Sequence, residues 1–206
     1  FFDAFSGPYV PSSDVSPIWN PEVFGNTLVV NGNTWPKCTV ERRRYRIRFL
    51  NGCNARTLIL KLVASAAPGL PRPLEPHPDV KFWVIGTEGG FLPDSALSLD
   101  ELLMMPAERF DLIIDFSKAP NDVDSLYLVN EGPDEPFGGG EPAVDFDVAN
   151  PATTGVVMRF DLVPASGLDG SADPAIVARL TVSAERDGNA VRISVDDTGP
   201  GGPEKA

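Results

Sequence analysis

The segment 43–50 alternates between arginines and apolar residues along its length. The alternating residues are, in order, Arg44, Tyr45, Arg46, Ile47, Arg48 and Phe49. Because successive side chains of a β-strand point to opposite faces of a sheet, this pattern predicts a strand with one face in a core and one in water. The fold must therefore contain a sheet whose two faces meet different surroundings.

A second segment, 110–116, alternates in the same way, with Asp111, Ile113 and Asp115 in place of the arginines. Asn31-Gly32-Asn33 has the residues of a tight turn, since Asn and Gly tolerate a positive φ. Further strands are predicted where short apolar or β-branched runs lie between turn residues, at 27–30, 35–40, 57–63, 80–87, 125–130 and 153–163. The proline-rich segment 64–79 is predicted to be a surface loop.

The chain of 206 residues contains 19 glycines and 21 prolines, which favour many short strands over long helices. The pattern predicts an all-β domain, a β-sandwich or barrel, at residues 22–165. Residues 1–21 are predicted to be an interdomain linker. Residues 166–206 are predicted to be a linker with a β-hairpin around Asp187-Gly188 and a disordered tail. Since the chain begins with Phe1 rather than Met, we expect a processed or excised piece of a longer protein.

The formal net charge is −12 and the sequence pI is about 4.4. A surface this acidic repels phosphate groups, so neither nucleic acid nor an anionic membrane is an expected partner. No apolar run approaches the roughly 20 residues that span a bilayer. We expect a soluble protein, and the sequence leaves the compartment open between secreted and cytoplasmic.

The single histidine, His77, limits the metal chemistry of the chain. A blue-copper site needs two histidines and a cysteine, usually with a weak axial methionine. His77 lies between two prolines in the predicted loop, distant in sequence from Cys38 and Cys53, and we expect it to be exposed. The two cysteines predict one bridge or, as we favour, buried free thiols. We therefore predict no metal ligands and no catalytic residues.

The charged residues allow both a functional and a structural interpretation. The arginines at 42–48 form either an anion-binding patch or, as we favour, ion pairs with Glu41, Glu108 and Asp111. A carboxylate pair and a calcium site at Asp145 and Asp147 stay open, although alternating aspartates on strands ordinarily form a solvated or ion-paired face.

Four separated blocks resemble, in this order, the middle domain of three-domain multicopper oxidases: VNGNTWP, RRRYRIRFLNGCNAR, GTEGGFLP and MPAERFDLIIDF. They are most similar to the branch that contains spore-coat laccases, bilirubin oxidases and phenoxazinone synthases. The resemblance covers about residues 21–162, and four ordered blocks are far more specific than one short motif. It implies a cupredoxin-like fold, a Greek-key β-sandwich or barrel.

The resemblance also implies a role. In such enzymes the coppers lie in the first and third domains, which the middle domain holds in register, and the parent oxidises phenolic or bilirubin-like substrates by one-electron steps while reducing dioxygen to water. The matching loops of this chain would line the substrate pocket, at Pro21, Glu22, Asn54, Ala55, Gly138 and Gly139. A disulfide that ties two such loops in spore-coat laccases is missing, since Phe24 stands in the place of its first cysteine.

Two other classes of function stay open. One is a copper-free scaffold relative that serves protein–protein interaction, which sister domains without copper histidines would identify. The other is an independent β-sandwich binding module, which needs exposed coplanar aromatics; among Trp19, Trp35 and Trp83, we expect the last two in the core. Exposed interdomain faces also favour self-association of the isolated chain.

Overall fold

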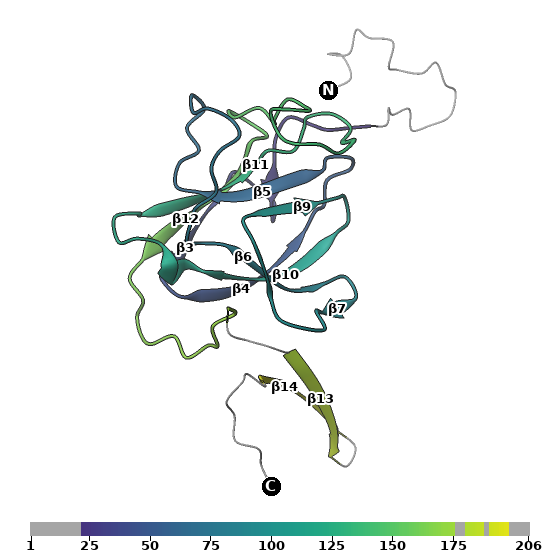
Figure 1. Cartoon of the computed structure of the whole chain (residues 1–206), viewed down its shortest axis with the longest axis vertical. Helices are drawn as coiled ribbons and strands as arrows, with labels where there is room; N and C mark the ends of the chain where they lie inside the picture. Colours follow the sequence, from purple (N-terminus) through teal and green to yellow (C-terminus); the bar gives the residue numbers. More distant parts are fainter. Residues whose placement is uncertain (1–21, 176–179, 188–189, 198–206) are drawn as a thin grey trace, which may run out of the picture.

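The computed structural model of the chain describes residues 22–175, 180–187 and 190–197. Most strands of this part belong to two five-stranded sheets (Figure 1). The first sheet contains β4 (Arg44–Leu50), β10 (Arg109–Asp115), β6 (Phe82–Thr87), β7 (Gly90–Phe91) and β8 (Leu97–Leu99). The second sheet contains β3 (Lys37–Glu41), β12 (Val156–Val163), β11 (Ser125–Asn130), β5 (Leu58–Val63) and β9 (Glu101–Met104).

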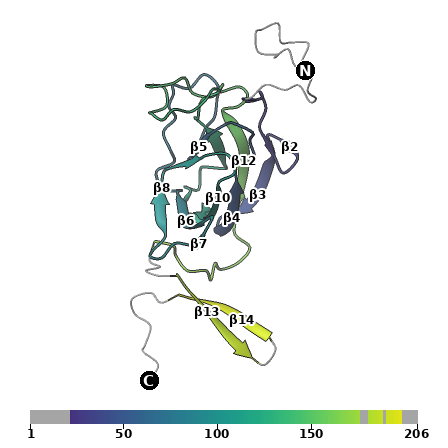
Figure 2. The same ribbon diagram turned by 90° about the vertical axis from the view of Figure 1, so that its right-hand side faces the viewer.

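The two sheets pack face to face around one core. The main cluster of buried side chains draws on strands of both sheets, and Figure 2 shows these strands in two layers. On β10, Leu112 and Ile114 are completely buried. On β4, Tyr45, Ile47 and Phe49 pack against the same cluster. The predicted all-β fold and the core faces of both alternating segments are confirmed.

The chain crosses repeatedly between the sheets, and its first and last sandwich strands end up side by side. β3 and β12 pair in parallel, with Lys37 opposite Arg159 and Glu41 opposite Val163. The other described strand pairs are antiparallel. No helix in the described ranges is long and apolar enough to cross a membrane.

The predicted turn at Asn31-Gly32 is confirmed. It joins β1 (Val29–Val30) to β2 (Asn33–Thr34), and its two residues have φ values of 50° and 84°. A positive φ at both central positions matches the twist of a two-residue hairpin.

The predicted C-terminal hairpin is confirmed as well. β13 (Leu180–Asp187) pairs antiparallel with β14 (Ala190–Asp197). Gly188 and Asn189, which were predicted to form its turn, lie outside the described residues, as do the tail from 198 onward and the predicted linker 1–21.

The tryptophans depart from expectation. Trp35, predicted to be in the core, is 44% exposed. Its φ of 42° turns the chain between β2 and β3, and its Nε1 donates to the carbonyl oxygen of Thr153 at 3.1 Å. Trp83 is half-buried because it lies between the inward-facing Phe82 and Val84 on β6. Trp19 lies outside the described residues.

The proline-rich segment 64–79 is anchored by a buried ion cluster, which the prediction of a surface loop missed. Glu131 is completely buried, and its Oε2 accepts from Lys61 Nζ at 2.8 Å. Its Oε1 accepts from Arg72 at 3.2 Å and from the Leu74 N–H at 2.7 Å. Lys61 also lies 3.2 Å from Glu101. These contacts join the segment to β5, β9 and the end of β11.

The arginines at 42–48 donate to carboxylates and backbone carbonyls of this chain. Arg46 makes two bonds to Asp111, at 2.9 and 2.6 Å, and Arg43 lies 3.3 Å from Glu41. Arg42 donates to backbone carbonyls instead, among them that of Val123 at 2.6 Å. The favoured ion-pair interpretation is confirmed for Glu41 and Asp111. For Glu108 it is not, since that carboxylate accepts the N–H of Met105 at 2.6 Å.

A segment beyond β12 folds back on the edge strand β4 through Arg44. The Arg44 N–H donates to Asp169 at 2.7 Å, and its guanidinium donates to the Ser171 carbonyl at 2.8 Å. The same guanidinium pairs with Asp173 at 3.5 Å and with the buried Asp115 at 3.1 Å. We call residues 169–173 the strap.

Candidate functional site

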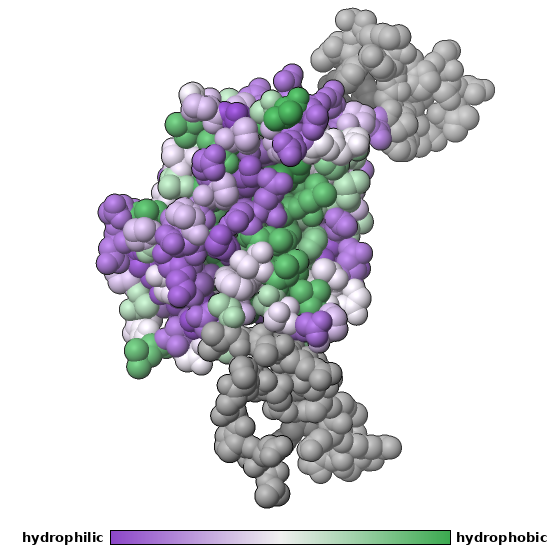
Figure 3. Space-filling view, in the orientation of Figure 1, coloured by the Kyte–Doolittle hydropathy of each residue, from purple (hydrophilic) through white to green (hydrophobic). Residues whose placement is uncertain are grey.

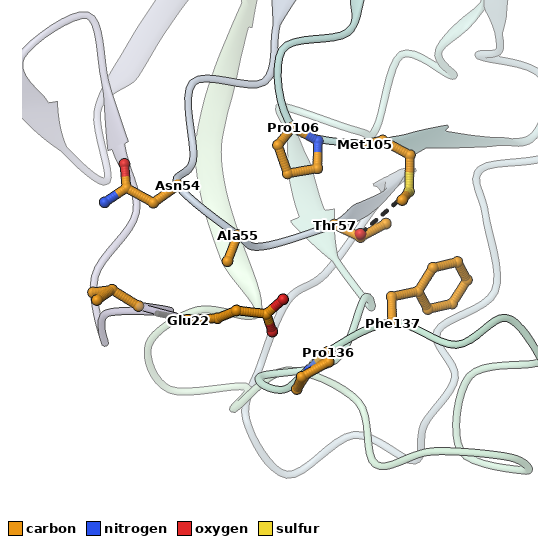
Figure 4. A pocket seen from close by; sticks show the side chains of 9 residues that line it. Glu22, Asn54, Ala55, Thr57, Met105, Pro106, Pro136 and Phe137 are labelled. Carbon is orange, nitrogen blue, oxygen red and sulfur yellow. Dashed lines mark hydrogen bonds between the residues drawn. The ribbon is translucent and has the colours of Figure 1, made fainter. Parts of the chain in front are cut away.

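A cavity of about 770 Å³ opens where four loop segments meet (Figure 4). The segments precede β1, join β4 to β5, follow β9 and follow β11. Their lining residues are Glu22, Val23, Asn54, Ala55, Thr57, Met105, Pro106, Pro136 and Phe137. A cavity of this size accommodates a small organic molecule.

The cavity wall is largely apolar, with few polar groups. Figure 4 shows the Glu22 carboxylate pointing into the space between Ala55 and Pro136. On the far side the Thr57 hydroxyl donates to the sulfur of Met105 at 3.3 Å. An apolar wall with a few placed polar groups is typical of sites for small molecules.

The structure brings together three of the six residues predicted for this site. Glu22, Asn54 and Ala55 all line the cavity. Gly138 and Gly139 are exposed and follow the lining residue Phe137 without lining the cavity themselves. Pro21 lies outside the described residues. That these residues meet a substrate stays a prediction.

Sequence reasoning missed the part of the wall formed by Met105, Pro106, Pro136 and Phe137. A signal for the first two was present, since they begin the fourth block of the resemblance. Pro136 and Phe137 lie inside the loop from which only the glycines were chosen. An aromatic residue beside a proline was the better candidate there, because it offers contact area that glycine lacks.

Arg56 is buried behind the wall, with its side chain 1% exposed. It donates to the carbonyl oxygens of Phe24 and Gly25 at 2.7 and 2.8 Å. It also donates to the Pro133 carbonyl at 3.3 Å and pairs with the carboxylate of Asp134. Arg56 ends the second block of the resemblance, but nothing in the sequence showed that its side chain would be buried and would join separate loops.

The described residues do not fit a copper ion. His77 is buried, at 5% exposure, which corrects the prediction of an exposed loop histidine. Its Nδ1 accepts the N–H groups of Asp79 and Val80 at 3.2 Å each, so that nitrogen is engaged by backbone. Burial lowers the pKa of this imidazole, against the weaker opposing effect of the Asp79 charge. In the part of the chain that the structure describes, no three His, Cys, Asp or Glu side chains are grouped to hold a metal.

The two cysteines are free thiols, as favoured, but they are not both buried. Cys38 is exposed on β3, and Cys53 is half-buried. Burial raises the pKa of the Cys53 thiol, only partly offset by the charge of Arg56. A thiol with a raised pKa is a poor thiolate ligand for a metal.

Sequence comparison relates this chain to copper oxidases. A multicopper oxidase of rice (Oryza sativa subsp. japonica) is 40% identical over 155 residues, which are 74% of this chain and 24% of the rice protein. A laccase of Bacillus subtilis (strain 168) is 33% identical over 175 residues, which are 84% of this chain and 29% of the laccase. Most of this chain is homologous to part of a multicopper oxidase. No family model matches the sequence.

The structural comparison agrees with this homology. The McoA multicopper oxidase of the hyperthermophile Aquifex aeolicus matches 84% of this chain and 33% of its own chain, with a TM-score of 0.55 and 30% identity. The predicted relationship to multicopper oxidases and laccases is confirmed, and so is the cupredoxin-like fold. The chain spans about a quarter of the length of the curated relatives that it matches. Its assignment to the middle of three domains stays a prediction.

Proposed function

We propose that this chain is the copper-free middle domain of a three-domain multicopper oxidase. It holds copper-bearing sister domains of the same polypeptide in register, and its four-loop cavity forms part of the wall of the substrate site. The parent oxidises phenolic or bilirubin-like substrates in one-electron steps and reduces dioxygen to water.

One observation carries the proposal. The chain matches multicopper oxidases over most of its own length but only 24–29% of theirs in the two relatives described, while its single histidine cannot supply the ligands of a blue-copper site. A segment with this homology and this ligand content fits the domain that separates the copper centres. The Glu22, Asn54 and Ala55 side chains around one cavity support a role at the substrate.

The proposal is tested first on the coding sequence around this segment, and then on protein. We expect His-X-His pairs upstream and a His-Cys-His cluster with a later Met downstream. Flanking domains without those histidines would instead identify a scaffold relative that acts in protein–protein interaction.

Metal content provides the second part of the test. The purified 206-residue chain should contain no stoichiometric copper after dialysis against Cu²⁺, and should not oxidise a phenol. The full-length parent, prepared alongside it, should contain copper and consume dioxygen when a phenol is added. Stoichiometric copper in the short chain would contradict the proposal.

A further inference from the structure

Arg56 joins separate loops of the cavity wall through one side chain. It stands between Ala55 and Thr57, which both line the cavity, but its own side chain points behind the wall and is buried. A buried guanidinium is costly unless acceptors surround it. The groups that accept hydrogen bonds from Arg56 therefore show which segments it holds together.

The acceptors around Arg56 come from two segments that are remote in sequence. Nη2 donates to the carbonyl oxygens of Phe24 and Gly25, at 2.7 and 2.8 Å, and the guanidinium carbon lies 5.6 Å from the centre of the Phe24 ring. Nη1 donates to the carbonyl of Pro133 and to the carboxylate of Asp134. The guanidinium thus links the segment before β1, the segment before β5 and the segment after β11.

Asp134 extends this link to a fourth segment. Its carboxylate accepts the hydroxyl of Thr154, at 2.7 and 2.9 Å, and the N–H of Asn150 at 3.0 Å. These residues precede β12, a central strand of the second sheet. The Asp134 carboxylate therefore ties the loop that carries Pro136 and Phe137 both to Arg56 and to the segment before β12.

We propose that Arg56 and Asp134 form a clamp that sets the spacing of the loops 22–25 and 133–137, and with it the width of the cavity. A planar guanidinium directs its donors along fixed directions, whereas an ammonium is a compact charge without such geometry. Lysine at position 56 would keep the charge but could not reach both segments in the same way. The consequence for substrates rests on the proposed function; the clamp itself does not.

The clamp is tested on the full 206-residue chain by backbone ¹⁵N relaxation. In the wild type we expect both loops to have order parameters near the rigid value of about 0.85. Arg56→Lys should lower the values at Val23 to Gly25 and at Asp134, Glu135 and Phe137 to below about 0.6. Asp134→Asn should lower only the second group, because Phe24 and Gly25 keep their donor.

Arg46→Lys is the matched control, since it breaks another two-bond pair with an aspartate, on the outer face of β4. It should leave both loops rigid. The clamp is overturned if Arg56→Lys leaves both loops rigid. It is also overturned if the order parameters of the loops fall only together with those of β4 and β10, because that result would indicate a general loss of stability.

The role in specificity is tested in the full-length parent by steady-state kinetics with a small and a bulky phenol. We expect Arg56→Lys to change the ratio of the two KM values roughly tenfold, as for a lost interaction of ordinary strength, with copper content and kcat kept. Loops that loosen while the KM ratio stays constant would contradict the pocket role in the proposed function and leave the clamp standing. A constant ratio with rigid loops would overturn the clamp itself.

Discussion

Glu131 illustrates what one buried carboxylate requires of its neighbours. Lys61, Arg72 and a backbone N–H surround it, and Lys61 also pairs with Glu101 at the rim. Burial by itself lowers the pKa of the Lys61 ammonium, but the hydrogen bonds and charges of Glu131 and Glu101 outweigh burial and leave this pKa above its usual value. Such an ion cluster adds little to the free energy of unfolding relative to well-packed apolar residues. Removing one of its partners nevertheless lowers that free energy strongly, because an uncompensated charge stays buried.

Glu131→Gln tests this cost. The substitution keeps the shape of the side chain but leaves Lys61 and Arg72 without their shared anion, so the free energy of unfolding should fall by about 3 kcal/mol. Urea denaturation measures the change. Glu135→Gln, an exposed change in the same loop, should stay within about 0.5 kcal/mol of the wild type. Equal effects of the two variants would show that the buried cluster is not a strong determinant of stability.

His77 gives the second prediction at this scale, and the chain offers a clear signal because it contains no other histidine. Burial lowers the pKa of this imidazole, so the unfolded chain binds the proton more readily. Stability should therefore be full above the unfolded value of about 6.5 and be lost as the pH falls through the folded pKa. An NMR titration of the single imidazole should give a midpoint below 6.5; a midpoint at or above that value contradicts the prediction.

Single residues were the hardest features to predict. Lys61 stands alone in an apolar strand, which is a signal for a buried anion, but the sequence does not tell which of 29 acidic residues supplies it. Its partner, Glu131, lies 70 residues away. His77 was expected to be exposed because its neighbours are prolines. The fold shows instead that its segment is hydrogen-bonded to β5, since the His77 N–H donates to the carbonyl oxygen of Leu62.

Among the elements, β4 is the edge strand whose end the strap covers. Free N–H groups at a sheet edge invite pairing with another chain, and Asp169 engages the one at Arg44. Hydrogen bonds from Ser171 and from the Arg44 backbone hold the pKa of Asp169 well below its usual value. The carboxylate therefore stabilises the strap above about pH 4, and this contribution is lost as the pH falls through the folded pKa.

Asp169→Asn should release the strap at neutral pH. We expect the amide of Arg44 to exchange with solvent roughly tenfold faster, as for the loss of one hydrogen bond to a charged group. Hydrogen exchange followed by NMR measures this rate. Asp122→Asn, an exposed change before β11, should leave the rate as it is. Unchanged exchange at Arg44 in both variants would mean that the strap does not protect this edge.

Elements were predicted far better than single residues, because period-2 alternation depends on local geometry alone. The alternation in β4 and β10 gave the core face of each strand, and the Asn31-Gly32 turn followed from backbone preferences. The residues that line the cavity were predicted only in part. Its wall combines loops whose approach depends on the whole sandwich, so resemblance by position could indicate the loops but not which side chains face inward.

At the scale of the whole molecule, an apolar area lies over β9 in the middle of Figure 3. β9 is the last strand of its sheet, with β5 as its neighbour among the described strands, and Leu103 and Met105 are 45% and 41% exposed. In the proposed parent, we expect a sister domain to cover this area.

The isolated chain should therefore associate with itself. Sedimentation velocity at rising concentration should show dimers or larger species, and Leu103→Lys should shift them to monomer by placing a charge on the exposed edge. Val144→Lys, at an equally apolar and still more exposed position in the loop between β11 and β12, serves as the control. A wild-type chain that stays monomeric at every concentration contradicts the prediction.

The parallel pair of β3 and β12 has a mechanical consequence. The chain enters the pair at Lys37 and leaves it at Val163, and in parallel neighbours these two points lie at opposite ends. Tension applied along the polypeptide therefore slides the strands past each other and loads all their ladder hydrogen bonds together, whereas an antiparallel hairpin would open one bond at a time. In the proposed parent, force transmitted between the flanking domains would thus meet shear resistance, and the sandwich should yield abruptly and at high load rather than unzip.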